Sequence, residues 1–363
     1  MDTLRTGIIG ATGFAGAELA RIIARHPAFE AVALTAGAEA GTPIGELYPA
    51  LADAYPGVKL VSHDDPSLLT CDVVFMAVPH TAGMQHAARL IEHGVNVVDL
   101  SADFRFNDID LYETTYAVTH TAPELARNAV YGQPETMREQ LAALAERRAA
   151  GTPAVIGCAG CYVTASILAA APALQAGLVD PSALIVVDGI SGITGAGRKA
   201  TARTHYCNGD ENVEAYGFPF HRHAPEIAQA YARLHPALSG AADVRMSFTP
   251  HLAPLRRGLL ATVYLPLAAD VADADLHETY ARFFEDAPLV SVLEPGVWPK
   301  TASVAGTARA HVNVAVDERQ RVATALCAID NLGKGAAAQA VQCANILFGL
   351  PEDAGLQAIA CIP

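Results

Sequence analysis

Two cysteines near the middle of the chain have the surroundings that nucleophilic chemistry needs. Cys158 and Cys161 lie between an apolar strand predicted over Pro153–Ile156 and an apolar helix predicted over Ser166–Leu174. A thiol at a helix N-terminus has a lowered pKa, because the helix dipole and free N–H groups favour the thiolate. The thiolate is the form that attacks an acyl carbon. Cys161 lies nearer the helix and is therefore the predicted nucleophile.

The same cysteines have other interpretations. A cysteine is often a small residue of the core. The C-x-x-C spacing is also that of a redox dithiol or of half a zinc site. No second C-x-x-C occurs in the chain, which argues against a four-thiolate zinc site. From the local sequence alone, a core role and a redox role stay open beside the nucleophile.

Two histidines form a second group suited to chemistry. His221 and His223 follow Tyr216 in a dense polar segment just before a predicted helix. Attack by a thiol and the later collapse of its adduct need a proton carrier with a pKa near neutrality, which histidine provides. In an extended segment both rings lie on one side of the chain. The alternatives are a hydrogen-bonded surface turn and a metal site completed by His205 and Cys207.

A glycine-rich loop joins a predicted first strand, Thr6–Ile9, to a predicted helix, Phe14–Arg25. Glycine lets the backbone turn sharply and approach a pyrophosphate, and the helix N-terminus supplies free N–H groups. Strand, loop and helix occur in the order that a dinucleotide site requires. The residues predicted to bind the dinucleotide are Gly10, Thr12, Gly13, Phe14, Ala15 and Gly16.

The end of the next predicted strand, Ala31–Thr35, bears on which dinucleotide binds. NAD-binding folds usually carry an acid there for the ribose hydroxyls. Here the strand is followed by Ala36 and Gly37. The missing acid favours NADP, although no arginine replaces it.

The elements that position these residues alternate between strands and helices in the first half of the chain. Asp72–Val78 and Val95–Leu100 are apolar runs, as in strands covered on both faces. Helices are predicted over Thr81–His93 and Met137–Ala150. This order predicts a Rossmann-type, doubly wound parallel sheet.

In the second half, the predicted strands are longer and more widely spaced. An alanine-rich helix, Gly335–Phe348, ends the pattern. The predicted fold class is therefore α/β, with a doubly wound parallel sheet plus an α+β catalytic domain that has a mixed sheet. The strands predicted in this half are Ala183–Asp188, Asp243–Thr249, Leu259–Leu265 and His311–Val316.

Length, charge and cysteine usage limit what the chain can be. Its 363 residues suffice for two domains, and 52% of them are hydrophobic. A net charge of -14 disfavours nucleic-acid and membrane partners, but it allows a small anionic substrate in a local basic cluster. No apolar run approaches the roughly 18–20 residues of a membrane span, and the start lacks the apolar segment of a signal peptide. The seven cysteines are irregularly spaced and indicate reduced thiols in the cytoplasm.

A series of motifs along the chain resembles one known family. The motifs occur in order at Gly10–Gly16 (G-A-T-G-F-A-G), Asp99–Arg105 (D-L-S-A-D-F-R), Val130–Glu135 (V-Y-G-Q-P-E), Gly160–Thr164 (G-C-Y-V-T), Ser191–Arg198, His221–Ile227, Thr249–Pro254, Arg257–Thr262 and Ile329–Gln342. They are similar to those of the N-acetyl-gamma-glutamyl-phosphate reductases of arginine biosynthesis. The match runs from end to end in the family's order, so chance does not explain it.

The resemblance implies a fold like that of the aspartate-semialdehyde dehydrogenases. The expected dinucleotide-binding domain comprises residues 1–160 and 330–363, and the expected catalytic and oligomerisation domain comprises residues 161–329. The resemblance also implies a homo-oligomer, either a dimer or a tetramer. It puts Asn331, Lys334 and Gly335 near the nicotinamide.

The resemblance further implies a reaction. NADP(H) would reduce a small anionic acyl phosphate, N-acetyl-gamma-glutamyl phosphate, to the semialdehyde through a thioester on Cys161. His221 is the expected acid/base, with His223 as the alternative, and no metal is expected. The other residues expected at the site are Arg105, Arg198, His223 and Tyr216 for the substrate, with Arg222 behind them, and Ser191, Gly192 and Asn331 for the cofactor.

Some positions depart from the family pattern. Cys158-Ala159 stand where the family usually has Asn-Pro, Val163 where Pro or Ala is frequent, and Ala36-Gly37 where Ser-Arg is frequent.

The alternative substrates are the homologous aminoadipyl phosphate, one methylene longer, and aspartyl phosphate. A pocket discriminates one methylene by only about 1–3 kcal/mol. A non-catalytic cofactor-binding protein and a C-x-x-C redox protein are the alternative classes.

Overall fold

The computed structural model describes residues 3–362 and divides into two compact units. The first unit joins the chain up to Ala159 with Ala336–Leu356, and the second comprises Gly160–Gly335 and the residues from Gln357 on. Residues 330–335 and those after Leu356 therefore lie in the second unit, whereas the expected first domain included all of 330–363. Within the described residues, no helix combines the length and the apolar character needed to cross a membrane.

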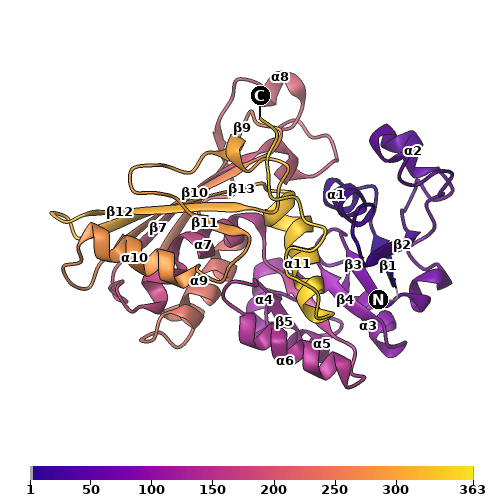
Figure 1. Cartoon of the computed structure of the whole chain (residues 1–363), viewed down its shortest axis with the longest axis horizontal. Coiled ribbons are helices and arrows are strands. Elements are labelled where there is room, and N and C mark those ends of the chain that lie inside the picture. The colour runs from indigo at the N-terminus through magenta and orange to yellow at the C-terminus, as the bar shows by residue number, and fades with distance from the viewer. Residues whose placement is uncertain (1–2, 363) are drawn as a thin grey trace. The chain divides into compact units, whose positions relative to one another are not determined.

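The first unit is built on a six-stranded sheet in which every pair of neighbouring strands is parallel (Figure 1). Its strands are β1 (Leu4–Ile9), β2 (Phe29–Leu34), β3 (Val73–Met76), β4 (Asn96–Asp99), β5 (Val130–Gly132) and β6 (Val155–Cys158). The strand order is β2-β1-β3-β4-β6-β5. The chain runs outward from β1 to β2 and returns to β3 on the other side of β1, which creates a switch point there. The predicted doubly wound parallel sheet is confirmed.

Helices of the first unit pack on this sheet, and α11 returns to it late in the chain, beside α6 and β4. α3 begins at Met84 and not at the predicted Thr81, because the Asp103 carboxylate accepts the N–H groups of Thr81 at 2.7 Å and Gly83 at 2.8 Å. The helices are α1 (Phe14–Ile23), α2 (Ile44–Leu47), α3 (Met84–Glu92), α4 (Ile109–Tyr116), α5 (Pro123–Asn128), α6 (Arg138–Ala149) and α11 (Ala338–Leu347).

The second unit contains a seven-stranded mixed sheet in the order β11-β12-β13-β10-β7-β9-β8. Its strands are β7 (Ile185–Gly192), β8 (Glu214–Ala215), β9 (Met246–Ala253), β10 (Leu259–Pro266), β11 (Val290–Val292), β12 (Ala310–Asp317) and β13 (Val322–Ile329). The β7/β9 and β11/β12 pairs are parallel and the others antiparallel, so the predicted mixed sheet is confirmed. β13 has no counterpart among the predicted strands. Its alanines have low strand propensity, and pairing with β10 and β12 overrides that preference.

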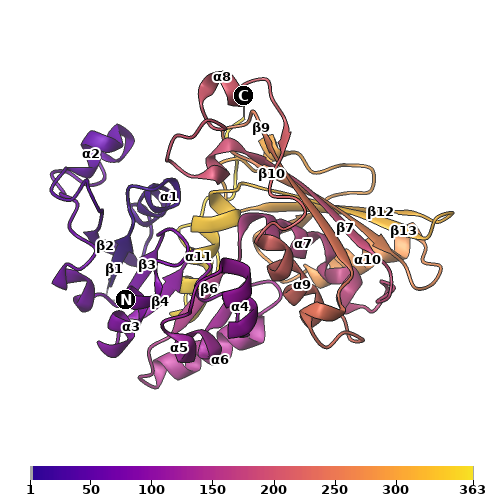
Figure 2. The same ribbon diagram turned by 180° about the vertical axis from the view of Figure 1, so that it is seen from behind.

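One face of this sheet is covered by helices, with α7 against β10 and β13 and α10 against β12 (Figure 2). The helices of this unit are α7 (Cys161–Gln175), α8 (Tyr206–Gly209), α9 (His223–Leu234) and α10 (Asp273–Phe283). Every residue of α7 from Tyr162 to Leu174 is buried. A helix that is apolar all round is a core helix, so α7 is the centre of the second unit.

Other element ends also differ from their predicted positions, and β7 extends to Gly192, beyond the predicted Asp188. α7 begins at Cys161 itself and not at Ser166. β9 begins at Met246, because the Asp243 carboxylate instead accepts the N–H groups of Ser239 and Gly240 in a short 3-10 turn. α11 begins at Ala338 and not at the predicted Gly335, because a π-helical turn, Gly333–Ala337, precedes it. The short 3-10 segments are Pro49–Leu51, Pro66–Thr70, Ile193–Ala196, Ala241–Asp243 and Thr301–Ser303.

The close approach of β6 to the chain around Phe104 yields a stability prediction. A Cβ at Gly157 would lie 2.0 Å from the carbonyl oxygen of Phe104. Gly157→Ala should therefore destabilise the protein by about 1–3 kcal/mol, the usual cost of overpacking, and lower its melting temperature in thermal unfolding. Gly240→Ala is the control, because no atom lies within 4 Å of its Cβ position. Equal melting temperatures for the two variants would contradict this account.

Candidate active site

The predicted nucleophile is the first residue of α7. Gly160 is the N-cap, and the first turn of the helix carries no acidic side chain. Cys161 is partly exposed, whereas Cys158, at the end of β6, is only 1% exposed. A helix N-terminus stabilises a thiolate through its dipole. The accessible thiol of the pair is thus also the one in the electrostatic position for attack.

The backbone of Gly335 lies directly against Cys161. A Cβ at Gly335 would lie 2.9 Å from the Cβ of Cys161, closer than two such atoms approach. The N–H of Gly335 donates to the carbonyl of Asp330 at 2.9 Å. The segment from Asp330 to Gly335, which we call the thiol loop, is therefore held beside the thiol, and glycine is required at its end.

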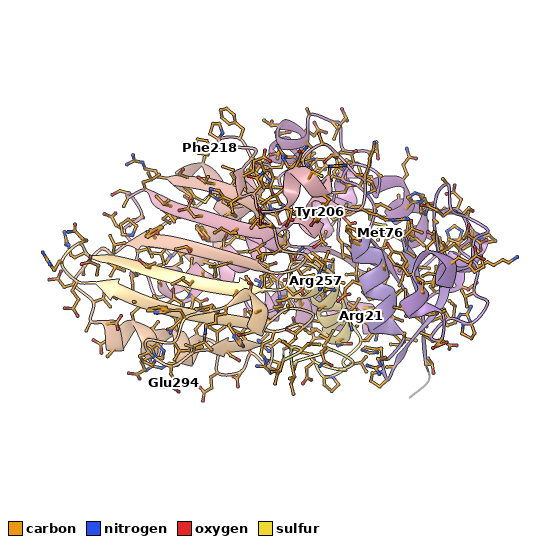
Figure 3. All side chains as sticks on the ribbon, turned by 90° about the horizontal axis from the view of Figure 1, so that it is seen from above. Arg21, Met76, Tyr206, Phe218, Arg257 and Glu294 are labelled. Atoms are coloured by element: carbon orange, nitrogen blue, oxygen red, sulfur yellow. The ribbon has the colours of Figure 1, made fainter. Side chains whose placement is uncertain are left out.

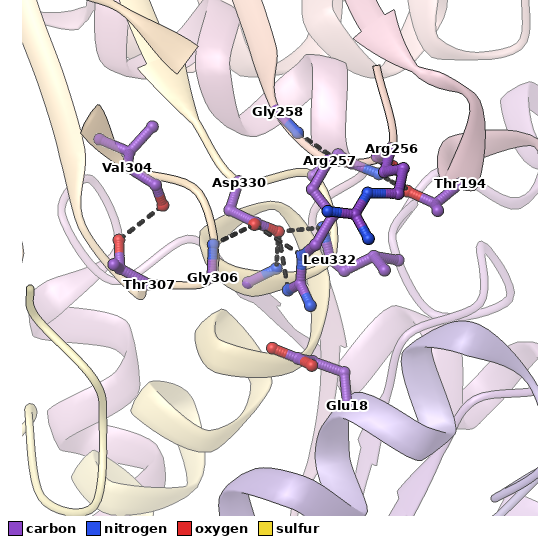
Figure 4. Close-up of polar contacts among 12 residues, drawn as sticks. Glu18, Thr194, Arg256, Arg257, Gly258, Val304, Gly306, Thr307, Asp330 and Leu332 are labelled. Atoms are coloured by element: carbon purple, nitrogen blue, oxygen red, sulfur yellow. Dashed lines mark hydrogen bonds and ion pairs between the residues drawn. The ribbon is translucent and has the colours of Figure 1, made fainter. Parts of the chain in front are cut away.

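Asp330 anchors the thiol loop through its carboxylate (Figure 4). The carboxylate accepts hydrogen bonds from Nε of Arg257 at 2.7 Å and from Nη2 at 3.0 Å. It also accepts the N–H groups of Leu332 at 2.8 Å, Gly333 at 2.7 Å and Gly306 at 2.5 Å. Asp330 is fully buried, and a buried carboxylate is tolerated only when it is paired and hydrogen-bonded. These contacts join three stretches of the chain at the thiol loop.

Asn331 connects the thiol loop to the ends of two strands. The N–H of Gly258, just before β10, donates to Oδ1 of Asn331 at 2.8 Å. Nδ2 of Asn331 donates to Oγ1 of Thr194 at 2.9 Å, just after β7. Ser191 and Gly192 are the last residues of β7. The residues of this unit that were expected to bind the cofactor, Ser191, Gly192 and Asn331, therefore share one region.

The ring of His221 lies among aromatic side chains. Its centroid is 6.1 Å from that of Tyr162, 5.4 Å from that of Tyr216 and 5.4 Å from that of Phe248. Burial lowers the pKa of His221 to about 4, and the positive charge of Arg222 adds to the effect. His221 is therefore neutral at pH 7.

A backbone hydrogen bond sets the tautomer of this ring. The N–H of His223 donates to Nδ1 of His221 at 3.1 Å. Because Nδ1 accepts, Nε2 carries the proton of the neutral ring. The two predicted histidines do lie together, with ring centroids 4.9 Å apart. The geometry favours His221 as a hydrogen-bond donor through Nε2 over a proton carrier.

Tyr162 connects Cys161 to the aromatic cluster. Its hydroxyl donates to the carbonyl of His251 at 2.7 Å, and the hydroxyl of Tyr216 donates to it at 3.4 Å. Its ring packs on Gly189, where a Cβ would lie 2.5 Å from the ring. Burial raises the pKa of Tyr216 to about 12 and the pKa of Tyr162 above its usual range, and a negative charge on Cys161 acts in the same direction. Both hydroxyls are protonated at pH 7.

Glu226 belongs to the site, although no role for it was predicted. It is fully buried in the first turn of α9, and its carboxylate accepts the N–H of Gly160 at 3.1 Å. Gly160 is the N-cap of α7, so Glu226 fixes the backbone immediately before Cys161. In the sequence, Glu226 is an acid in the motif His221–Ile227 and in the first turn of a predicted helix, which alone indicates only a favourable interaction with the helix dipole.

In the first unit, the glycine loop has a backbone that requires glycine. Gly10 has a φ of +85°, and a Cβ there would lie 2.5 Å from the carbonyl oxygen of Ala77. A Cβ at Gly16 would lie 2.1 Å from the carbonyl oxygen of Gly10. Gly13 is the N-cap of α1, whose first turn has no acidic side chain. The loop leaves β1 at the switch point, so its N–H groups suit a pyrophosphate. The other predicted residues of this turn are Thr12, Phe14 and Ala15.

The two arginines expected at the substrate differ in their surroundings. Arg105, in the first unit, is 4% exposed, and its Nη2 donates to the carbonyl of Leu100 at 2.8 Å. Burial raises the pKa of Asp99 to about 7 and Asp103 adds to this, whereas Arg105 opposes it. This buried cluster favours a structural role for Arg105. Arg198, in the second unit, is exposed between β7 and α8 and is accessible to a ligand.

The cysteines and histidines of the site could also belong to a metal site or a redox dithiol. Within residues 3–362, no group of three or more His, Cys, Asp or Glu side chains is arranged to hold a metal ion. His205 and Cys207 are exposed around α8, whereas His221 and His223 are half-buried. All seven cysteines are free thiols.

Comparison with known proteins decides the family. A family model described as "Semialdehyde dehydrogenase, NAD binding domain" matches residues 5–144, and one described as "Semialdehyde dehydrogenase, dimerisation domain" matches residues 161–331. The N-acetyl-gamma-glutamyl-phosphate reductase of Desulforudis audaxviator is 44% identical over 97% of this chain and 98% of its own. That of Neisseria meningitidis serogroup C is 42% identical over 99% of each chain. The chain belongs to the N-acetyl-gamma-glutamyl-phosphate reductase family.

Solved structures show the fold that this reductase family member adopts. The aspartate semialdehyde dehydrogenase II of Vibrio cholerae, complexed with ASA, has a TM-score of 0.71 at 17% identity and covers 96% of this chain and 98% of its own. The aspartate semialdehyde dehydrogenase of Candida albicans, with NADP, has a TM-score of 0.71 at 16% identity and covers 95% of this chain and 98% of its own. At such identities the likeness concerns the fold alone, and it confirms the expected fold.

The thiol loop yields a prediction about stability and rate. Asp330→Asn removes the charge that pairs with Arg257, and breaking a buried pair costs about 3–5 kcal/mol. We expect a lower melting temperature and a lower rate in the reductase assay, because the loop beside Cys161 loses its anchor. Glu278→Gln is the control, since it removes a surface ion pair with Arg282, which is worth at most about 1 kcal/mol. If Asp330→Asn melts and reacts like the control, Asp330 does not anchor the loop.

Proposed function

We propose that the chain reduces N-acetyl-gamma-glutamyl phosphate to N-acetylglutamate semialdehyde with NADPH, in arginine biosynthesis, through a thioester on Cys161. The observation that carries the proposal is the partly exposed thiol at the N-terminus of the buried helix α7. Relatives named for this activity are 42–44% identical over nearly the whole chain. The match supports the glutamyl substrate over the aminoadipyl and aspartyl alternatives.

The first half of the reaction is acyl transfer. The Cys161 thiolate attacks the acyl carbon, and the C–O bond to phosphate breaks with its electrons on the phosphate. The helix dipole of α7 stabilises the thiolate before attack. The neutral His221 donates from Nε2 to the carbonyl oxygen as negative charge develops there, as an oxyanion-hole donor does. The product is a thioester, which divides a difficult reduction into two easier steps.

The second half returns the thiolate. A bound reduced nicotinamide supplies hydride chemistry to the reaction. The chain's own residues then stabilise the thiohemiacetal oxyanion, again through the Nε2–H of His221. When this oxyanion collapses, the C–S bond breaks and the electrons return to the Cys161 sulfur. Because the thiolate both attacks and leaves, His221 need not carry a proton.

The residues proposed to bind ligands form two groups, one for the cofactor and one for the substrate. The glycine loop, Gly10–Gly16, binds the pyrophosphate through its N–H groups. Ser191, Gly192 and Asn331 stay the predicted cofactor residues of the second unit. Tyr216 and His223 line the substrate site, and Arg198 pairs with its phosphate or carboxylate. Arg105 stays a weaker candidate because of its buried cluster. The absence of an acid in Leu34–Gly37 supports NADP(H) over NAD(H).

We also propose a homo-oligomer formed through the second unit, either a dimer or a tetramer. The family model that matches residues 161–331 is described as a dimerisation domain. The sheet face opposite α7 exposes Ile190 and Tyr264, and Phe218 projects outward from this unit (Figure 3).

A cytoplasmic location fits the chemistry, because a nucleophilic thiol must stay reduced and the cytosol keeps thiols reduced.

Replacement of the nucleophile gives the first functional prediction. Cys161→Ser should abolish phosphate-dependent oxidation of N-acetylglutamate semialdehyde, followed as NADPH absorbance, because serine forms no thiolate-like nucleophile at pH 7. Cofactor affinity in the same variant should stay unchanged. Cys158→Ser is the matched control and should keep most of the rate. The nucleophile is wrongly assigned if the two variants behave the other way round.

A pair of variants tests whether His221 acts as a hydrogen-bond donor or as a proton carrier. Glutamine keeps a side-chain N–H donor and phenylalanine keeps only the ring, so His221→Phe should lose about 10²–10³ in kcat and His221→Gln distinctly less. The pKa of about 4 keeps His221 neutral from about pH 6 to 8. The pH dependence of the wild-type kcat should therefore show no change that comes from ionisation of His221 in that range. Equal losses in both variants would instead support proton transfer.

A further inference from the structure

The loop before His63 runs along the end of β2 in the first unit. The N–H of Val61 donates to the carbonyl of Leu34, and the N–H of Ala36 donates to the carbonyl of Val61, both at 2.9 Å. Thr35 and Val61 thus continue the parallel pairing beyond β2. His63 therefore lies at the carboxyl end of β2, which is where doubly wound folds bind the adenosine ribose of a dinucleotide.

A buried hydroxyl orients the imidazole of His63. Oγ1 of Thr35 accepts the N–H of Gly10 at 3.4 Å and lies 2.6 Å from Nδ1 of His63. Thr35 is fully buried, so its hydroxyl proton must be donated within the protein, and Nδ1 is at hydrogen-bond distance. Nδ1 therefore accepts, and Nε2 carries the proton of the neutral ring. The same hydroxyl connects the ring to Gly10 of the glycine loop.

The Nε2–H of His63 faces the position where a side chain is missing. A Cβ at Gly37 would lie 3.9 Å from Nε2 of His63. Gly37 is exposed, and its φ is not in the left-handed region. The chain thus presents a hydrogen-bond donor from another loop at the position where dinucleotide folds place an acid for NAD or an arginine for NADP.

A second imidazole and an ion pair lie near His63. His86, on α3, lies 6.0 Å from it between ring centroids, and its Nδ1 is 3.8 Å from the Asp64 carboxylate. Arg89, also on α3, is 3.5 Å from the same carboxylate. His86 and Arg89 therefore both lie beside the exposed carboxylate of Asp64. Burial lowers the pKa of His63 and His86 lowers it further, while Asp64 raises it, so the ring is neutral at pH 7 until an anion binds.

We propose that His63 selects the 2′-phosphate of the dinucleotide, donating from Nε2 beside Gly37 in place of the absent arginine. This inference rests on the proposed function, because it assumes that the first unit binds a dinucleotide. A phosphate at Nε2 favours the protonated imidazole, so binding takes up a proton. Affinity for a 2′-phosphate should therefore rise as the pH falls from about 8 to about 6.

The test measures binding of 2′,5′-ADP and of 5′-AMP by calorimetry, since these probes differ in the 2′-phosphate and need no turnover. His63→Asn keeps an amide that can accept the Thr35 hydroxyl but has no donor at the Nε2 position. We expect this variant to bind 2′,5′-ADP about tenfold more weakly and 5′-AMP with unchanged affinity. The rise in 2′,5′-ADP affinity toward low pH should disappear in this variant, because the imidazole that takes up the proton is gone and protonation of the phosphate only removes negative charge.

Two further variants sharpen the test. His93→Asn removes an exposed histidine just after α3, whose Nδ1 hydrogen-bonds to the carbonyl of Arg89 in the same helix, and it should leave both affinities unchanged. Gly37→Arg, added to His63→Asn, should restore 2′,5′-ADP binding, because a guanidinium at that position reaches a phosphate and the position has room for a side chain.

The outcomes separate this inference from the proposed function. If the wild type binds 2′,5′-ADP and NADPH but His63→Asn binds 2′,5′-ADP equally well, His63 does not select the phosphate and the proposed function stands. Equal weakening of 2′,5′-ADP and 5′-AMP would likewise overturn the selection. If the wild type binds none of these nucleotides, the proposed cofactor use fails and this inference fails with it.

Discussion

The proposed reaction depends on holding one thiol at the start of a buried helix. α7 is buried from Tyr162 to Leu174, and Cys161 is its partly exposed first residue. Glu226 fixes Gly160 before the thiol, and Gly335 lies against its Cβ. A reactive group on a rigid element keeps the geometry that attack requires. The surrounding contacts serve this one constraint.

The charges around the thiol are arranged so that the sulfur is the group that becomes negative. Tyr162 and Tyr216 are protonated at pH 7, and His221 is neutral, because burial disfavours the charged form of each. The carboxylate of Asp330 is paired with the Arg257 guanidinium. The helix dipole then acts on Cys161 together with the Glu226 carboxylate at Gly160 and the buried Lys334 next to Gly335. A neutral donor such as His221 can hydrogen-bond to an oxyanion without forming the ion pair that an imidazolium would form with the thiolate.

Patterns that arise from local chemistry could be predicted from the sequence. The apolar runs of β3 and β4, the glycine loop and the cysteine before an apolar helix each reflect a local rule, and the structure has all three. The thiol loop could not be predicted, because Arg257 and Asp330 are distant in sequence and an ion pair between them leaves no periodicity. β13 was missed because sheet pairing overrides alanine's propensity. The tautomer of His221 depends on a backbone hydrogen bond that no residue type encodes.

The most direct test of the central claim is to trap the acyl-enzyme. Wild-type protein and Cys158→Ser are mixed with N-acetyl-gamma-glutamyl phosphate without cofactor, quenched in acid, digested and analysed by mass spectrometry. The account predicts an N-acetylglutamyl group on the peptide that contains Cys161 in both proteins, and its loss when NADPH is added before quenching. An acyl group on another cysteine, or none under conditions in which the same sample turns over, would contradict it.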